Sequence, residues 1–188
     1  MRRVFISIHI EPKPELMNVY NDFKEMLVNE PVKWVRPENF HITLAFLGDL
    51  TEERISSLSD KLERVAVLCT PFTIEFSGVG VFRTIRNPSV IWIGLKPSIP
   101  LNTLKYQIDE ILHKEDLPVE SGDFSPHLTF ARLKTRKYLK EIHQLVEKHK
   151  NKELESLRIE SFAFNQSILK PSGAVYRPIA VYPMSSPM

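Results

Sequence analysis

The chain has 188 residues, of which 43% are hydrophobic and 26% are charged, as in an ordinary globular protein and unlike a disordered or fibrous one. Its 25 Lys and Arg residues against 23 Asp and Glu residues give a formal net charge of +2, which excludes a general polycation that binds nucleic acid through bulk charge. A single cysteine, Cys69, excludes an internal disulfide and a zinc site built from cysteines.

Hydrophobic patterns predict alternating strands and helices along the whole chain. Alternation of apolar and polar residues indicates a strand, and apolar residues three or four positions apart indicate a helix. In chain order the predicted elements are a strand at 4–10, a helix at 14–28, a strand at 40–47, a helix at 51–65 with Thr51 as its N-cap, strands at 72–82 and 90–95, a helix at 101–112, a strand at 127–133, a helix at 138–149, and strands at 157–164, 167–169 and 174–182.

This order contains the unit β-α-β-α-β twice, which predicts two similar halves at about 3–82 and 89–182. The strand at 40–47 aligns with residues 126–133, because His41 and His127 lie 86 positions apart. The same offset pairs Phe76 with Phe162, and residues 5–7 with 91–93. We therefore expect an α+β protein with one domain, residues 1–188, that is built as a structural repeat.

The N-terminus and the length of the apolar runs indicate the cellular location of the protein. No apolar run reaches the ~20 residues that a membrane helix needs. Residues 1–10 are basic and then apolar but lack a small-residue cleavage site, so they do not resemble a signal peptide. We expect a cytoplasmic monomer that does not contact a membrane.

The two aligned strands share four identical positions spaced two residues apart. Side chains alternate between the faces of a strand, so these positions are expected on one face. They are His41 and His127, Thr43 and Thr129, Ala45 and Ala131, and Leu47 and Leu133. The residues between the first three positions are apolar, so two such strands packed about a pseudo-twofold axis would place two imidazoles and two hydroxyls around one cavity. These apolar residues are Ile42, Leu44, Leu128 and Phe130. A single such strand often does no more than satisfy a backbone group or face water.

Two histidines and two threonines favour acid–base chemistry without a metal. A metal site normally needs a third ligand, and neither strand contains Asp or Glu. Cys69 has no matching histidine context, and the Gly78–Gly80 segment lacks the rest of a phosphate-loop pattern. One neutral imidazole can take a proton while the other, charged, donates one. Threonine hydroxyls can donate to phosphate oxygens, so the set suits a phosphodiester such as a cyclic phosphate.

The segments His41–Leu44 and His127–Phe130 resemble the paired motifs of the two-histidine (2H) phosphoesterases, and most closely those of the RNA 2′,3′-cyclic phosphodiesterases, also called 2′-5′ RNA ligases. The resemblance extends over residues 3–8, 34–48, 78–82, 88–92, 125–127 and 167–176. It implies a bilobal fold in which two pseudo-symmetric β-α-β-α-β halves, with antiparallel sheets, face a central cleft.

The resemblance also implies a reaction and roles. The expected reaction is hydrolysis of RNA 2′,3′-cyclic phosphate ends to 2′-phosphates, with no cofactor and no metal. It implies His41 as the general acid, His127 as the general base, and Thr43 and Thr129 as phosphate ligands. A reversible, ATP-independent joining of tRNA halves through a 2′-5′ bond is the activity behind the ligase name.

The two copies differ at the fifth residue after each histidine, which is Phe46 in the first and Arg132 in the second. Strict alternation puts both on the apolar face, where a cation needs a partner. A bulge would return both to the cleft, where an aromatic ring and a guanidinium can hold a nucleoside by stacking. Lys134 and Arg136 follow, either as RNA-backbone contacts or as a solvated loop.

Two other functions are compatible with the same residues. One is a related enzyme that opens cyclic phosphates on small nucleotides such as ADP-ribose derivatives, which turnover of mononucleotides against RNA would distinguish. The other is a module that binds nucleotides or RNA without turnover. The remaining histidines do not repeat the motif and are expected at the surface: His9, His113, His143 and His149.

Overall fold

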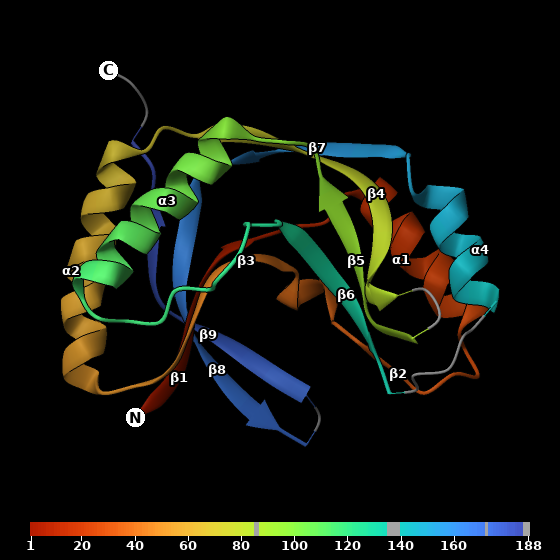
Figure 1. Ribbon diagram of the computed structural model, residues 1–188, viewed down its shortest axis with the longest axis horizontal. Coiled ribbons are helices and arrows are strands. Elements are labelled where there is room, and N and C mark those ends of the chain that lie inside the picture. Colours follow the sequence, from red (N-terminus) through yellow and green to blue (C-terminus); the bar gives the residue numbers. More distant parts are fainter. Residues whose placement is uncertain (85–86, 135–139, 172, 186–188) are drawn as a thin grey trace.

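The computed structural model describes residues 1–84, 87–134, 140–171 and 173–185 (Figure 1). Four helices and nine strands occur in this part of the chain. In chain order they are β1 (Arg2–His9), α1 (Pro14–Met26), β2 (Val32–Trp34), β3 (His41–Leu50), α2 (Glu52–Leu68), β4 (Phe72–Thr84), β5 (Asn87–Leu95), α3 (Ile99–Lys114), β6 (His127–Leu133), α4 (Lys140–His149), β7 (Glu153–Ile159), β8 (Ser161–Lys170) and β9 (Gly173–Pro183), with a short 3-10 turn at Pro37–Asn39.

The structure confirms the predicted order of elements, with three differences. The strand expected at 167–169 is not a separate element, because these residues belong to β8. The strand expected at 157–164 is wrong: β7 ends at Ile159 and β8 begins at Ser161, because the chain changes pairing partner from β4 to β1 at this point. The apolar pattern continues through the break, so periodicity does not reveal it. The three-residue strand β2, which pairs with β6, was not predicted. Thr51 caps α2 as expected, since its hydroxyl accepts from the Arg54 amide.

The strands of the described residues form one curled antiparallel sheet in the order β7-β4-β5-β6-β3-β1-β8-β9, with β2 beside β6. Its centre is the contact between β3 and β6, where Ile42 pairs with Leu128. The sheet therefore has two lobes, β3-β1-β8-β9 and β7-β4-β5-β6, that meet at the two strands carrying the repeated motif.

Each lobe is built from both halves of the chain. β4 of the first half pairs with β5 of the second, and β8 of the second half pairs with β1 of the first. The helices follow the same exchange: α2 and α3 lie together at one end of the molecule, and α1 and α4 lie together at the other (Figure 1). This reciprocal exchange gives the expected α+β fold with two pseudo-symmetric halves.

The apolar faces of β3 and β6 anchor the core beneath the repeated motif. Ile42, Leu44, Leu128 and Phe130 are fully buried. Phe130 packs edge-on against Phe23 of α1, with ring centroids 5.1 Å apart. The two central strands are thus held by core packing on one face, which fixes what their other face presents. In the part of the chain that the structure describes, no helix combines the length and apolarity needed to cross a membrane.

A bulge interrupts both central strands at the same place. On β3, Ser7 pairs with Thr43 and Ile6 pairs with Ala45, so Leu44 is skipped. On β6 the register skips Phe130 in the same way, between Thr129 and Ala131. The expectation that the alanines and leucines share the histidine face is therefore wrong: the alternation inverts at the bulge, and Ala45 and Ala131 are 3% and 0% exposed.

The ladder also corrects one alignment between the halves. His41 pairs with His9 on β1, and His127 pairs with Gly94 on β5. The strand at the N-terminus therefore corresponds to β5 with an offset of 85 residues, from position 9 to position 94, rather than the expected 86. One residue of difference reverses which side chains face the cleft.

Candidate active site

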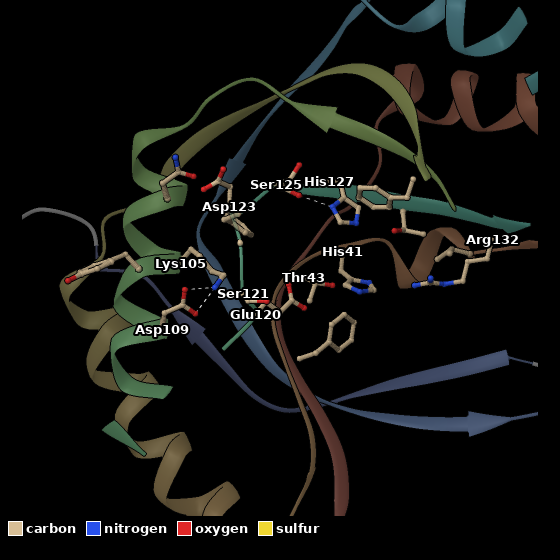
Figure 2. A pocket seen from close by; sticks show the side chains of 18 of the residues that line it. His41, Thr43, Lys105, Asp109, Glu120, Ser121, Asp123, Ser125, His127 and Arg132 are labelled. Carbon is tan, nitrogen blue, oxygen red and sulfur yellow. Dashed lines mark hydrogen bonds and ion pairs between the residues drawn. The ribbon is translucent and has the colours of Figure 1, made fainter. Parts of the chain in front are cut away.

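Both motif histidines lie in one cavity of about 680 Å³ between the lobes (Figure 2). They are the first residues of β3 and β6, and each is half-buried. Six of the predicted site residues line this cavity, which we call the catalytic cavity: His41, Thr43, Phe46, His127, Thr129 and Arg132. Lys134 is exposed just beyond β6 and is not among the lining residues, and Arg136 lies outside the described residues.

Equivalent hydrogen bonds orient the two imidazoles. His41 Nδ1 lies 2.7 Å from the carbonyl oxygen of Asn39, and His127 Nδ1 lies 2.8 Å from that of Ser125. A carbonyl oxygen only accepts, so Nδ1 donates in both rings. In each neutral ring Nε2 is therefore the unprotonated atom, which can take a proton as a base or donate one once charged.

Aromatic side chains also restrain both rings. Tyr176 of β9 meets His41 nearly perpendicularly, with centroids 5.1 Å apart, and Phe5 of β1 lies 5.3 Å from the same ring. Phe82 of β4 meets His127 nearly perpendicularly at 4.6 Å. These three residues lie within the segments that resemble the family, but nothing in their spacing shows that they contact the histidines.

Burial and neighbouring charges lower the pKa of both histidines below the ordinary value of 6.5. Burial is the largest cause for each ring, and the Arg132 guanidinium lowers both further. His9 and His127 add to the lowering at His41, whereas Glu120 opposes it at His127. In the substrate-free protein the neighbouring side chains therefore favour a proton on His127 over one on His41.

The bulges place Phe46 and Arg132 on the cleft face. Phe46 is 46% exposed and Arg132 is exposed, and both line the catalytic cavity. The expectation that a bulge would return the fifth residue to the cleft is thus met for both copies. An aromatic ring and a guanidinium stand beside the two imidazoles and could contact a nucleoside or a phosphate.

Residues of α3 and of the loop before β6 form the opposite end of the catalytic cavity. Figure 2 shows Lys105 and Asp109 at this end and Arg132 at the other, with the two histidines between them. Lys105 is 7% exposed and forms an ion pair with Asp109. Glu120 and Asp123 add two carboxylates. Sequence patterns did not identify this end, because its residues occupy the polar face of an amphipathic helix and a loop.

One histidine outside the motif is buried rather than exposed. His149, expected at the surface, is 2% exposed, and its Nε2 lies 3.1 Å from an Asp22 carboxylate oxygen, which corrects that expectation.

The residues that the structure describes contain no group of three His, Cys, Asp or Glu side chains that could hold a metal ion. Two Nε2 atoms, two hydroxyls and one guanidinium around one cavity are suited to acid–base attack on a phosphodiester.

A family model described as LigT like Phosphoesterase matches residues 8–92 and again residues 93–176. The two matches together cover most of the chain and divide it into two similar halves.

Curated relatives and solved structures agree with this match. The chain is 33% identical to an RNA 2′,3′-cyclic phosphodiesterase of Archaeoglobus fulgidus, over 96% of this chain and 99% of the relative. It is 30% identical to another of Methanothermobacter thermautotrophicus, over 96% and 97%. Its fold is similar to TT0787 of Thermus thermophilus (TM-score 0.77, 24% identity, 98% of each chain). It is also similar to E. coli LigT complexed with 3′-AMP (TM-score 0.73, 20% identity, 98% and 99%).

Proposed function

The chain belongs to the LigT-like phosphoesterase family, and we propose that it hydrolyses RNA 2′,3′-cyclic phosphate ends to 2′-phosphates. The observation that carries this proposal is the pair of equivalently oriented imidazoles, whose Nδ1 atoms both donate to a backbone carbonyl. The curated relatives carry the name of this activity. The test is turnover of an oligonucleotide that ends in a 2′,3′-cyclic phosphate.

In the proposed mechanism the two histidines act on opposite sides of the phosphorus. His127 Nε2 takes a proton from water, whose oxygen forms a new bond to phosphorus. The bond from phosphorus to the 3′ oxygen breaks, and His41 donates its Nε2 proton to that oxygen. Thr43 and Thr129 donate hydrogen bonds to the non-bridging oxygens, where negative charge increases. The product is a 2′-phosphate with a free 3′-hydroxyl.

This assignment requires a proton on His41 when substrate is bound. The neighbouring charges of the free protein favour His127 instead, because Glu120 acts on His127 alone. A phosphodiester anion between the rings raises the pKa of both. We propose that this anion supplies the missing stabilisation of the charged His41.

The terminal nucleoside is proposed to lie between Phe46 and Arg132. Both side chains reach the catalytic cavity because of the bulges, and both have planar groups that can stack on a base. Lys134 and Arg136 are proposed to contact the RNA backbone. We propose that one chain contains the complete site, so that the enzyme acts as a monomer on RNA ends, tRNA halves among them.

Replacing Arg132 by alanine (Arg132→Ala) should raise KM at least several-fold for an oligonucleotide, because stacking contributes about 1–3 kcal/mol per base. Ribose 2′,3′-cyclic phosphate, which lacks a base, should be affected far less. Steady-state kinetics on both substrates measure this, with Arg158→Ala on β7 as a matched surface control. Equal effects on both substrates would assign Arg132 to the phosphate, and no effect on either would leave it as a surface residue.

Thr43→Val and Thr129→Val keep the shape of each side chain and remove its hydroxyl. Each should lower kcat by about ten- to a hundredfold, since a hydrogen bond to a charged group contributes about 1.5–3 kcal/mol. Single-turnover rates of a cyclic-phosphate oligonucleotide measure the effect. Thr73→Val on the exposed face of β4 is the control. Wild-type rates in both variants would remove the hydroxyls from the mechanism.

The same site can use an RNA 5′-hydroxyl in place of water, which would form a 2′-5′ bond. We propose this ligation as the second activity, because a 5′-hydroxyl and water are equivalent nucleophiles for His127. A gel assay with a 5′-hydroxyl RNA and a cyclic-phosphate RNA tests it. Turnover confined to mononucleotides would instead support an enzyme that opens cyclic phosphates on small nucleotides. Binding of nucleotides or RNA without turnover would support a non-catalytic binding module.

A further inference from the structure

A second cavity lies beside His41 on the same face of the sheet. His9 and Ser7 on β1 pair with His41 and Thr43 on β3. Directly paired residues point to the same face, so Ser7 and His9 continue the catalytic face outward. They line a cavity of about 410 Å³, which we call the His9 cavity. His41 and Tyr176 line both cavities, so the two spaces meet at the proposed general acid.

The corresponding cavity in the other lobe, of about 430 Å³, has Trp92 in its lining, and His127 is not among the described residues that line it. Trp92 pairs with Thr129 on β6 and therefore takes the place that Ser7 has in the first lobe. Its ring lies over two glycines: a Cβ atom would come within 2.3 Å of the ring at Gly80 and 3.1 Å at Gly94. The two near-symmetric lobes thus differ here: the cavity beside Ser7 reaches the motif histidine His41, whereas the described lining of the cavity beside Trp92 does not include His127.

The lining of the His9 cavity suits a neutral, flat group. Phe5, Phe162, Pro178 and Val181 form apolar walls, and Ser7, His9, Asn39 and Asn165 add polar groups. Asn165 Nδ2 donates to Ser7 Oγ at 3.0 Å, which fixes the amide in the cavity wall. The described residues that line this cavity include one carboxylate, Glu38, and no Lys or Arg. Apolar walls with a few polar groups favour a nucleobase over a phosphate.

We propose that the His9 cavity holds the nucleoside immediately upstream of the one that carries the cyclic phosphate. This rests on the proposed function, in which His41 protonates the 3′ oxygen of the terminal ribose. That ribose therefore lies beside His41, where the His9 cavity begins. The next nucleoside enters the His9 cavity, because this cavity opens at His41, whereas the described lining of the cavity in the other lobe does not include His127. The enzyme is then specific for RNA ends over mononucleotide cyclic phosphates.

Filling the cavity tests this proposal. Val181 is 56% exposed and pairs with Ala163 on the cavity wall. Val181→Trp fills the cavity from its mouth, and Ala163→Leu fills it from the sheet. Val67→Trp on α2, where Val67 is 61% exposed, is the matched control. Calorimetry compares binding of a dinucleotide that ends in a 2′-phosphate with binding of the mononucleotide 2′-phosphate, and turnover of the cyclic counterparts is measured separately.

The wild-type protein and the Val67→Trp control should bind the dinucleotide at least about fivefold more tightly than the mononucleotide, as expected for one more stacked base. Val181→Trp and Ala163→Leu should bring this ratio close to one. Equal or undetectable binding of the two ligands by the wild type, or an unchanged ratio in both variants, overturns the inference. Because binding does not require turnover, a protein that shows the ratio but leaves cyclic phosphates intact would refute the proposed function alone.

Discussion

His41→Ala and His127→Ala should each lower turnover of a cyclic-phosphate RNA by about 10²–10⁴-fold, the usual contribution of a positioned acid or base. Both histidines are half-buried at strand ends, outside the fully buried core, so the fold should persist. Single-turnover kinetics measure the loss, and circular dichroism checks the fold. The double variant should be little worse than the slower single variant, because the two groups act as a unit. Rates near those of the wild type in either single variant would refute the two-histidine mechanism.

A para-nitrophenyl phosphodiester separates the two roles. Its phenolate departs without a proton, so loss of the general acid should matter little for this substrate. If His41 is the acid, His41→Ala should retain most of the wild-type activity on the nitrophenyl ester, and His127→Ala should not. The opposite pattern would make His127 the acid and His41 the base, which is the assignment that the side-chain charges of the free protein favour.

The second large effect is the dependence of rate on pH. One histidine must be neutral and the other charged, so the rate should fall by about tenfold per pH unit on both sides of an optimum. Because burial and Arg132 lower the pKa of both rings in the free protein, the optimum of kcat/KM should lie below pH 6.5. Binding of an anion raises both pKa values, so the optimum of kcat should lie at higher pH.

Two variants should move this optimum in opposite directions. Arg132→Ala removes a positive charge that disfavours protonation of both rings, so the optimum of kcat/KM should move to higher pH. Glu120→Gln removes the carboxylate that favours protonation of His127, so the optimum of kcat/KM should move to lower pH. The measured values belong to the coupled pair of histidines rather than to one ring. A flat profile, or shifts with the opposite signs, would contradict this electrostatic description.

The sequence predicted the order of elements and the repeated motif because both depend on strong local signals. Long periodic segments such as α2 fold as their apolar pattern indicates, and His41 and His127 are matched along the chain itself. Alternation, however, assumes an unbroken ladder. It placed Ala45 and Ala131 on the histidine face, whereas a bulge at Leu44 and Phe130 turns them into the core.

Other features depend on contacts between distant segments and leave no local signal. The exchange of β4 and β8 between the halves is a matter of pairing, which periodicity does not encode. Tyr176 reaches His41 from β9, and Lys105 and Asp109 reach the catalytic cavity from α3, which looks like an ordinary amphipathic helix in the sequence. His9 is exposed, as expected, but its position opposite His41 follows only from the strand register.

Hydrolysis of a cyclic-phosphate oligonucleotide in excess EDTA, with the product isomer identified by phosphorus NMR, tests the central claim most directly. The proposed roles predict an unchanged rate in EDTA and a 2′-phosphate as the product, since only the 3′ oxygen is protonated as it leaves. A 3′-phosphate product, or activity lost in EDTA and restored by a divalent ion, would contradict the claim.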